Sequence, residues 1–234
     1  MTHHVRHAVG ITMSPAQAAW ANGQHWPGCE VRVENWFDHK ADGPYDAIIA
    51  IEAVERFAGN TVWRARRVAR YRELFQRCDA WLRPAGRLSL PANAWNDRGW
   101  LPSMLLPPQL LTPHARGRGN PVRVGLLAIR DGVTNVREGL HASRKVFLEC
   151  FLPTCAELVE AGRGLFRVVE ARTDTGDGVK TVRAWLERSE ANRARGAELI
   201  GESAVSDIIR EQRTALRFLS EGRFTVLRMV FEKA

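Results

Sequence analysis

The first part of the chain alternates between apolar segments of strand length and segments with helical spacing. Residues 7–14 form an apolar run that ends in a tight turn, and the small residues at 15–22 then predict a helix. Apolar and polar residues alternate at 29–34, which indicates a strand. The near-continuous apolar run at 45–51 is typical of a central parallel strand that is covered on both faces. Residues 71–82 return to helical spacing, so strands and helices are expected to follow one another.

The same alternation resumes after an irregular segment. The further predicted elements are a strand at 87–90, a helix at 155–160, a strand at 166–170, a helical stretch at 179–219 and a strand at 224–231. Residues 91–145 are rich in proline, glycine and arginine, and we interpret them as a loop-rich cap or lid. The pattern predicts an α/β fold with right-handed crossovers. Its expected parts are an incomplete core at 1–90, the cap at 91–145 and the C-terminal part of the core at 146–234.

Composition narrows the classes of partner and location. The formal net charge of +8 comes from arginines spread along the chain, without a long run of like charges or a basic cluster interleaved with aromatics. We therefore expect no nucleic-acid binding, and a cleft for anionic ligands explains the charge as well. The four cysteines have spacings that match no zinc site, so we predict reduced thiols and no metal. Neither a secretory signal nor an apolar stretch of membrane-spanning length is visible, which predicts a cytoplasmic protein.

Several motifs, in this order along the chain, resemble one known family. Residues 10–17, 45–55, 71–78, 81–88 and 181–187 are similar to cyclopropane-fatty-acyl-phospholipid synthases and their mycolic-acid and natural-product relatives. The resemblance implies a Rossmann-like class I methyltransferase sheet with helices on both faces, and S-adenosylmethionine (SAM) as the family's cofactor. It covers most of the chain from residue 7 onward and has least support in the cap.

The resemblance also implies that part of the fold is missing. The strand at 7–14 matches the second strand of the family, and only six residues precede it. The first βα unit, whose glycine-rich turn holds the methionine end of SAM, therefore has no counterpart. That first strand lies in the middle of the family's sheet, so its absence leaves two internal edges with unpaired backbone groups. We expect a partner subunit or a homodimer to complete the sheet.

The resemblance assigns half of a cofactor site to this chain. The cofactor-binding residues that it implies are Thr12, Met13, Gln17, Asn35, Trp36 and Ile51. The first three match the ribose side of SAM, the next two match the adenine pocket, and Ile51 lies beneath the sulfonium together with Ala50. Other interpretations stay open, because Trp36 also suits a core aromatic and Thr12 and Gln17 also suit helix capping.

Glu55 and Arg56 are the predicted catalytic residues. Glu55 matches the family's strand-end glutamate, which helps to hold a base beside the transferred methyl group; cyclopropanation needs such a base because a proton must leave the new methyl. Without the resemblance, Glu55 would be interpreted as an exposed, solvated charge. Three residues depart from the family: Arg56 replaces a histidine, Pro91 replaces a histidine or glutamine, and Gly178 replaces a tyrosine.

These departures shape three hypotheses. The first is a degenerate or split methyltransferase-fold subunit of a natural-product or antibiotic biosynthetic complex, a hetero-oligomer that acts on a small anionic intermediate or helps a partner to bind it. Ring formation without methyl transfer is one reaction that this hypothesis allows. In this hypothesis SAM binding is left open. The alternative is a SAM-dependent methyl or methylene transferase on an alkene, lipid or natural-product acceptor, with the cofactor loop supplied by a partner. A pure scaffold without a ligand is the third.

Overall fold

The computed structural model describes residues 5–58, 63–97, 132, 134–136 and 150–234, so most of the predicted cap at 91–145 lies outside the described residues. The chain divides into two compact units, residues 1–44 and 45–234. The strands of the described residues form two sheets, one of two strands and one of four.

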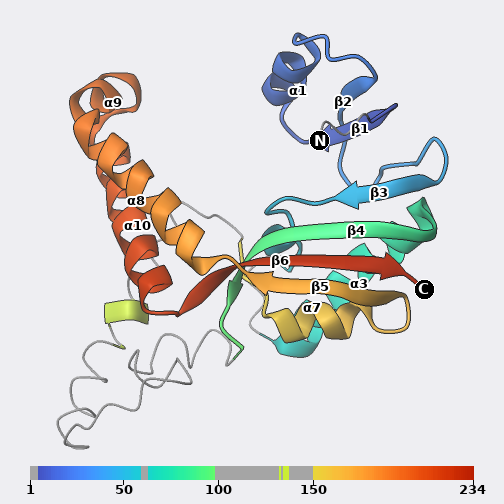
Figure 1. The fold of residues 1–234 in the computed structure, drawn as a ribbon. Helices are drawn as coiled ribbons and strands as arrows, with labels where there is room; N and C mark the ends of the chain where they lie inside the picture. The colour runs from blue at the N-terminus through green and yellow to red at the C-terminus, as the bar shows by residue number, and fades with distance from the viewer. Residues whose placement is uncertain (1–4, 59–62, 98–131, 133, 137–149) are drawn as a thin grey trace, which may run out of the picture. The chain divides into compact units, whose positions relative to one another are not determined.

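The first unit is a single βαβ motif (Figure 1). Strands β1 (Ala8–Thr12) and β2 (Cys29–Val33) pair in parallel, and helix α1 (Pro15–Asn22) connects them. The helix begins where the sequence predicts, because Pro15 suits the first turn and the Ser14 side chain accepts a hydrogen bond from the Gln17 N–H.

This unit buries few side chains. Among its described residues Ala18 is the only buried apolar side chain. Met13, Trp20 and Trp26 are 68%, 65% and 51% exposed, and the two indole rings meet edge to face at 6.1 Å. The first unit therefore folds around very little of its own apolar surface.

The second unit is built on a mixed sheet in the order β3-β4-β6-β5. The strands are β3 (Tyr45–Ile49), β4 (Leu82–Trp95), β5 (Phe166–Thr173) and β6 (Phe224–Lys233). β3 and β4 are parallel, whereas β6 is antiparallel to both β4 and β5. β4 continues to Trp95, beyond the predicted end at residue 90, because Pro91 stays within the ladder opposite Arg228.

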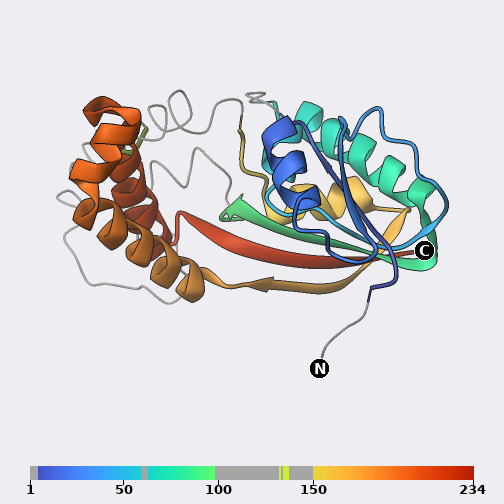
Figure 2. The same cartoon turned by 90° about the horizontal axis from the view of Figure 1, so that it is seen from above.

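Helices α3 (Arg64–Trp81) and α7 (Cys155–Gly162) lie together on one face of this sheet (Figure 2). The core beneath them is aromatic: the Phe75 ring meets Phe231 at 4.9 Å and Phe166 at 5.6 Å. Gly162 lies so close to Phe75 that an added Cβ would be 3.1 Å from its ring. The short helix α2 (Val54–Phe57) follows β3.

The predicted helical stretch at 179–219 is three helices, not one. They are α8 (Thr175–Ala191), α9 (Arg193–Ile200) and α10 (Glu202–Ser220). Asn192 separates α8 from α9. Gly201 ends α9 with a φ of 88°, a left-handed backbone conformation that residues with a side chain rarely adopt. Figure 1 shows α8 and α10 side by side as a hairpin that extends beyond the end of the sheet. No helix in the described part of the chain is both long enough and apolar enough to span a bilayer.

Candidate functional site

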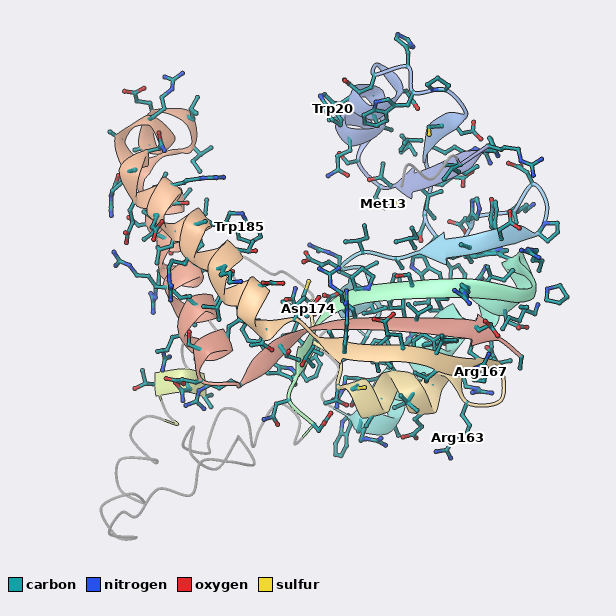
Figure 3. The ribbon with its side chains drawn as sticks, in the orientation of Figure 1. Met13, Trp20, Arg163, Arg167, Asp174 and Trp185 are labelled. Carbon is teal, nitrogen blue, oxygen red and sulfur yellow. The ribbon has the colours of Figure 1, made fainter. Side chains whose placement is uncertain are left out.

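Five of the predicted cofactor residues lie at the carboxyl end of the two-stranded sheet. Thr12 ends β1, and its hydroxyl donates a hydrogen bond to Gln17 Oε1 at 2.8 Å. The same hydroxyl accepts a hydrogen bond from the Ser14 N–H at 3.2 Å. The Met13 side chain, labelled in Figure 3, points into solvent at this turn. Thr12 and Gln17 are thus tied to each other across the start of α1.

Asn35 and Trp36 follow β2 at the same end. The Glu34 N–H donates to the Thr12 carbonyl at 3.1 Å, which joins the two strand ends. Asn35 Oδ1 accepts a hydrogen bond from the Phe37 N–H at 3.0 Å, forming an Asx turn, and the Trp36 ring meets Phe37 edge to face at 5.7 Å. The first unit therefore collects a hydroxyl, two amides and an indole at one sheet end, where open parallel sheets bind their ligands.

An open hollow of about 450 Å³ lies beside this turn; its lining residues are Thr12, Ala16, Gln17, Trp20, Ala21 and Val31. Most of these side chains are apolar, and Trp20 (Figure 3) is the largest of them. The hydroxyl and amide of Thr12 and Gln17 are its polar members. The hollow can therefore take an apolar group that carries a hydrogen-bonding end.

In the second unit Glu55 is buried, so the alternative interpretation of Glu55 as a solvated surface charge is wrong. Glu55 follows β3 on the short helix α2 and is only 4% exposed. Its Oε1 accepts a hydrogen bond from the Asn93 N–H at 2.7 Å, and its backbone carbonyl accepts one from the Phe151 N–H at 2.8 Å. Its Oε2 is buried and has no hydrogen-bond partner among the described residues.

Burial raises the pKa of the Glu55 carboxyl above its ordinary value of 4.5. The hydrogen bond from Asn93 acts in the opposite direction, and the nearby charge of Glu52 adds to the rise in pKa. A buried carboxyl with a raised pKa, and with one oxygen that has no partner among the described residues, suits proton transfer better than an exposed one. A buried acid with a shifted pKa is a candidate for a functional role.

The other predicted residues of this unit are exposed. Ile51 is 69% exposed, and the Arg56 side chain lies in solvent. Glu52, between them, has a positive φ of 48°, and its N–H donates to the Pro91 carbonyl at 2.8 Å. Pro91 thus contributes a backbone acceptor that holds the end of β3.

Close packing against β6 explains why a glycine stands at position 178. It lies in the first turn of α8, where an added Cβ would approach Val226 Cγ2 to 2.8 Å. A larger side chain at this position would push α8 away from β6. The family's tyrosine therefore does not fit here without movement.

Sequence reasoning missed the residues that hold Glu55 in place. The segment after residue 149 is fixed by a buried ion pair between Arg67 of α3 and Glu157 of α7, and the Arg67 guanidinium stacks over the Phe151 ring at 4.5 Å. Glu157 also accepts a hydrogen bond from the Thr154 N–H at 3.0 Å in a capping box. The Thr-x-x-Glu spacing is visible in the sequence, but nothing in the pattern shows that Arg67 lies opposite.

No group of three or more histidine, cysteine, aspartate or glutamate side chains within the described residues could hold a metal ion. Cys29, Cys78 and Cys155 are free thiols. Burial raises the pKa of the Cys78 thiol to about 12.

The chain has an α/β class I methyltransferase-like fold with a mixed sheet, as the resemblance implied. The chain is similar in structure to the cyclopropane synthase MmaA2 from Mycobacterium tuberculosis, with a TM-score of 0.75 and 18% identity over 97% of this chain and 70% of that chain. The chain is also similar to the mycolic acid cyclopropane synthase CmaA1 complexed with SAH and CTAB, with a TM-score of 0.74 and 20% identity over 97% of this chain and 70% of that chain. Its similarity to the [4+2]-cyclase SpnF has a TM-score of 0.59 and 14% identity, over 97% of this chain and 66% of that chain. No protein-family model and no curated protein sequence matches the chain.

Proposed function

We propose that this protein is a SAM-dependent methyl or methylene transferase that acts on an alkene in a lipid or natural-product acceptor, with part of the cofactor site supplied by a partner chain. The observation that carries the proposal is Glu55, a buried carboxyl at the carboxyl end of a parallel strand with one oxygen free of partners among the described residues. The structural similarity to two cyclopropane synthases supports the same reaction class.

The residues of the first unit suit a nucleoside. The hydroxyl of Thr12 and the amide of Gln17 are matched to a ribose, and they exchange their mutual hydrogen bond for bonds to its hydroxyls. Trp36 offers a ring plane for adenine, and the Asn35 amide nitrogen offers a donor beside it. When bound, SAM supplies an electrophilic methyl group.

Glu55 handles the proton that this reaction releases. Addition of a methyl group to an alkene leaves a positive charge on carbon, and loss of a proton from the added methyl closes the ring. The free Oε2 of Glu55 accepts this proton directly, or holds a small anion that accepts it, while Oε1 stays on the Asn93 N–H. Burial keeps water from competing and raises the affinity of the carboxylate for the proton.

Ring formation without methyl transfer, within a biosynthetic complex, is the second candidate. The exposed Arg56, the strand-embedded Pro91 and the tightly packed Gly178 stand where the family has side chains for its base site, and they favour this candidate. The structural similarity to a [4+2]-cyclase shows that the fold also carries such chemistry. In this case Arg56 contacts a small anionic intermediate.

A labelling experiment separates the two candidates. The chain, co-expressed with its neighbouring gene products, is incubated with methyl-labelled SAM and an alkene-containing lipid or pathway intermediate, and products are analysed by mass spectrometry. We expect labelled carbon in the product and a loss of about 10²–10⁴-fold in rate for Glu55→Gln. A cyclised product that contains no label would replace the transferase proposal with ring formation. Full activity of Glu55→Gln would remove the assigned role of this carboxyl in either reaction.

A further inference from the structure

His39 is a buried histidine in a unit that buries very little else. Among the described residues of the first unit only His39 and Ala18 are buried, and His39 is 6% exposed. Its Nδ1 lies 2.6 Å from Glu34 Oε2, and because an ionised carboxylate can only accept, the Nδ1–H group donates. Burying an imidazole costs free energy unless its nitrogens are hydrogen-bonded, and Glu34 provides the partner for Nδ1. The pair therefore differs from the exposed ion pairs of this chain.

This hydrogen bond closes a turn at the end of β2. The N–H groups of Asp38 and His39 both donate to the Asn35 carbonyl, at 3.0 and 3.1 Å. The side chains of Glu34 and His39 join the first and last residues of the same turn. The two residues matched to the adenine pocket, Asn35 and Trp36, lie between them in the chain. Their backbone is therefore held from both ends.

Glu34 connects this turn to the other half of the candidate nucleoside site. Its N–H donates to the Thr12 carbonyl at 3.1 Å, and the Thr12 hydroxyl bonds Gln17. The backbone of Glu34 is thus fixed to the ribose side of the site, while its carboxylate is held by His39 on the adenine side. A site whose parts are already in place loses less conformational freedom when a ligand binds, and so binds it more tightly.

A second ion pair on the same loop offers a contrast. Arg32 of β2 pairs with Asp42 at 2.6 Å and also with Glu30. The Asp42 side chain is 57% exposed, and exposed pairs of this kind contribute little to the stability of a fold. Asp42 lies on the same loop but beyond the turn that His39 closes. Breaking this pair should therefore leave the turn in place.

We propose that His39 is a positioning residue for nucleoside binding: its hydrogen bond to Glu34 holds the turn of Asn35 and Trp36 in the conformation that receives the base. His39 is buried, so it acts through the turn and not by touching the ligand. This role rests on the proposed function, since that function places adenosine at this turn. It adds to that function a residue outside every motif that carries the resemblance.

NMR titration of the isotope-labelled 234-residue chain with adenosine tests this role. The shifts of the Trp36 indole and of the amides in the turn give the dissociation constant, and the amides of β1 and β2 report whether the parallel pair stays folded. His39→Leu removes the donor and keeps an apolar group in the buried position. His39→Asn restores a donor, because the asparagine amide nitrogen is as many bonds from Cα as Nδ1 is. Asp42→Asn, which weakens the exposed pair, is the matched control.

Glu34→Ala attacks the same bond from its other side. The Glu34 side chain is partly exposed, so its removal leaves no buried hole and gives a second test should His39→Leu fail to fold. We expect the dissociation constant for adenosine to rise at least about tenfold in His39→Leu and in Glu34→Ala, since the turn then has to be ordered at the moment of binding. The double variant should bind no more weakly than either single variant, because each removes the same bond. His39→Asn should stay within about threefold of the wild type, and Asp42→Asn should match it.

Three outcomes would overturn this role alone. They are wild-type affinity in either folded variant that lacks the bond, an affinity in His39→Asn as weak as in His39→Leu, or an equally large loss in Asp42→Asn. A wild-type chain that shows no shift at millimolar adenosine would overturn this role together with the nucleoside site of the proposed function. A chain that binds adenosine as expected but transfers no label would keep this role and lose the transferase.

Discussion

Replacing Glu55 with glutamine should stabilise the folded chain at high pH and leave it unchanged at low pH. Burial raises the pKa of this carboxyl above 4.5, so the folded state holds its proton more tightly than the unfolded state does. The stability that protonated Glu55 contributes is fully present below pH 4.5 and is lost as the pH rises through the raised pKa. Glutamine cannot ionise, and its Oε1 still accepts the hydrogen bond from the Asn93 N–H.

The size of the effect follows from the pKa shift. Each pKa unit corresponds to about 1.4 kcal/mol of unfolding free energy, or roughly 3–6 °C in Tm for a chain of this length. Near pH 8 we expect the Tm of Glu55→Gln to exceed that of the wild type by roughly 3–6 °C for each unit by which the pKa of Glu55 is raised. The difference should shrink once the pH falls below the raised pKa of Glu55 and vanish below the ordinary value of 4.5.

Thermal denaturation followed by circular dichroism across this pH range measures the difference. Glu187→Gln, which changes an exposed carboxyl on α8 in the same way, is the matched control variant. A Tm for Glu55→Gln that is lower than that of the wild type at every pH would refute the reasoning. It would mean that the ionised carboxylate is satisfied in the fold and stabilises it.

Three further predictions concern packing and reactivity. Gly178→Ala should destabilise the chain by about 1–3 kcal/mol in urea denaturation, because its Cβ would crowd β6, whereas Gly176→Ala in open space should gain up to about 1 kcal/mol. Arg67→Ala should cost about 3–5 kcal/mol by leaving a buried carboxylate unpaired, whereas Arg64→Ala, which breaks an exposed pair on the same helix, should cost less than about 1 kcal/mol. The Cys78 thiol should stay unmodified by a disulfide reagent until the chain unfolds, because it is buried and its pKa is raised to about 12; rapid labelling in the native state would contradict this.

The sequence predicted the order and type of most elements because apolar periodicity is a local property. The strand was predicted to end at residue 90 but continues to Trp95, because Pro91 keeps its place in the ladder without an N–H. Its carbonyl is used instead, and accepts a hydrogen bond from the Glu52 N–H. The breaks at Asn192 and Gly201 interrupt a pattern that is helical throughout, so periodicity alone did not locate them.

The candidate site was less accessible to sequence reasoning. Local motifs placed Thr12 and Gln17 at a turn and Asn35 at a strand end, which the structure also shows. The burial of Glu55 was not predicted, since it depends on Phe151, a residue nearly a hundred positions away. Long-range contacts of this kind leave no periodic signal in the chain.

The sparse interior of the first unit has a consequence for the fate of the chain in a cell. Because residues 5–44 bury one apolar side chain, Ala18, this unit opens at little cost in free energy. Proteases cleave segments in proportion to the time they spend open. We expect a protease to cut the chain first within these residues, as limited proteolysis followed by mass spectrometry would show. The half-life of the chain would then be set by how often residues 5–44 open, whatever the stability of the second unit.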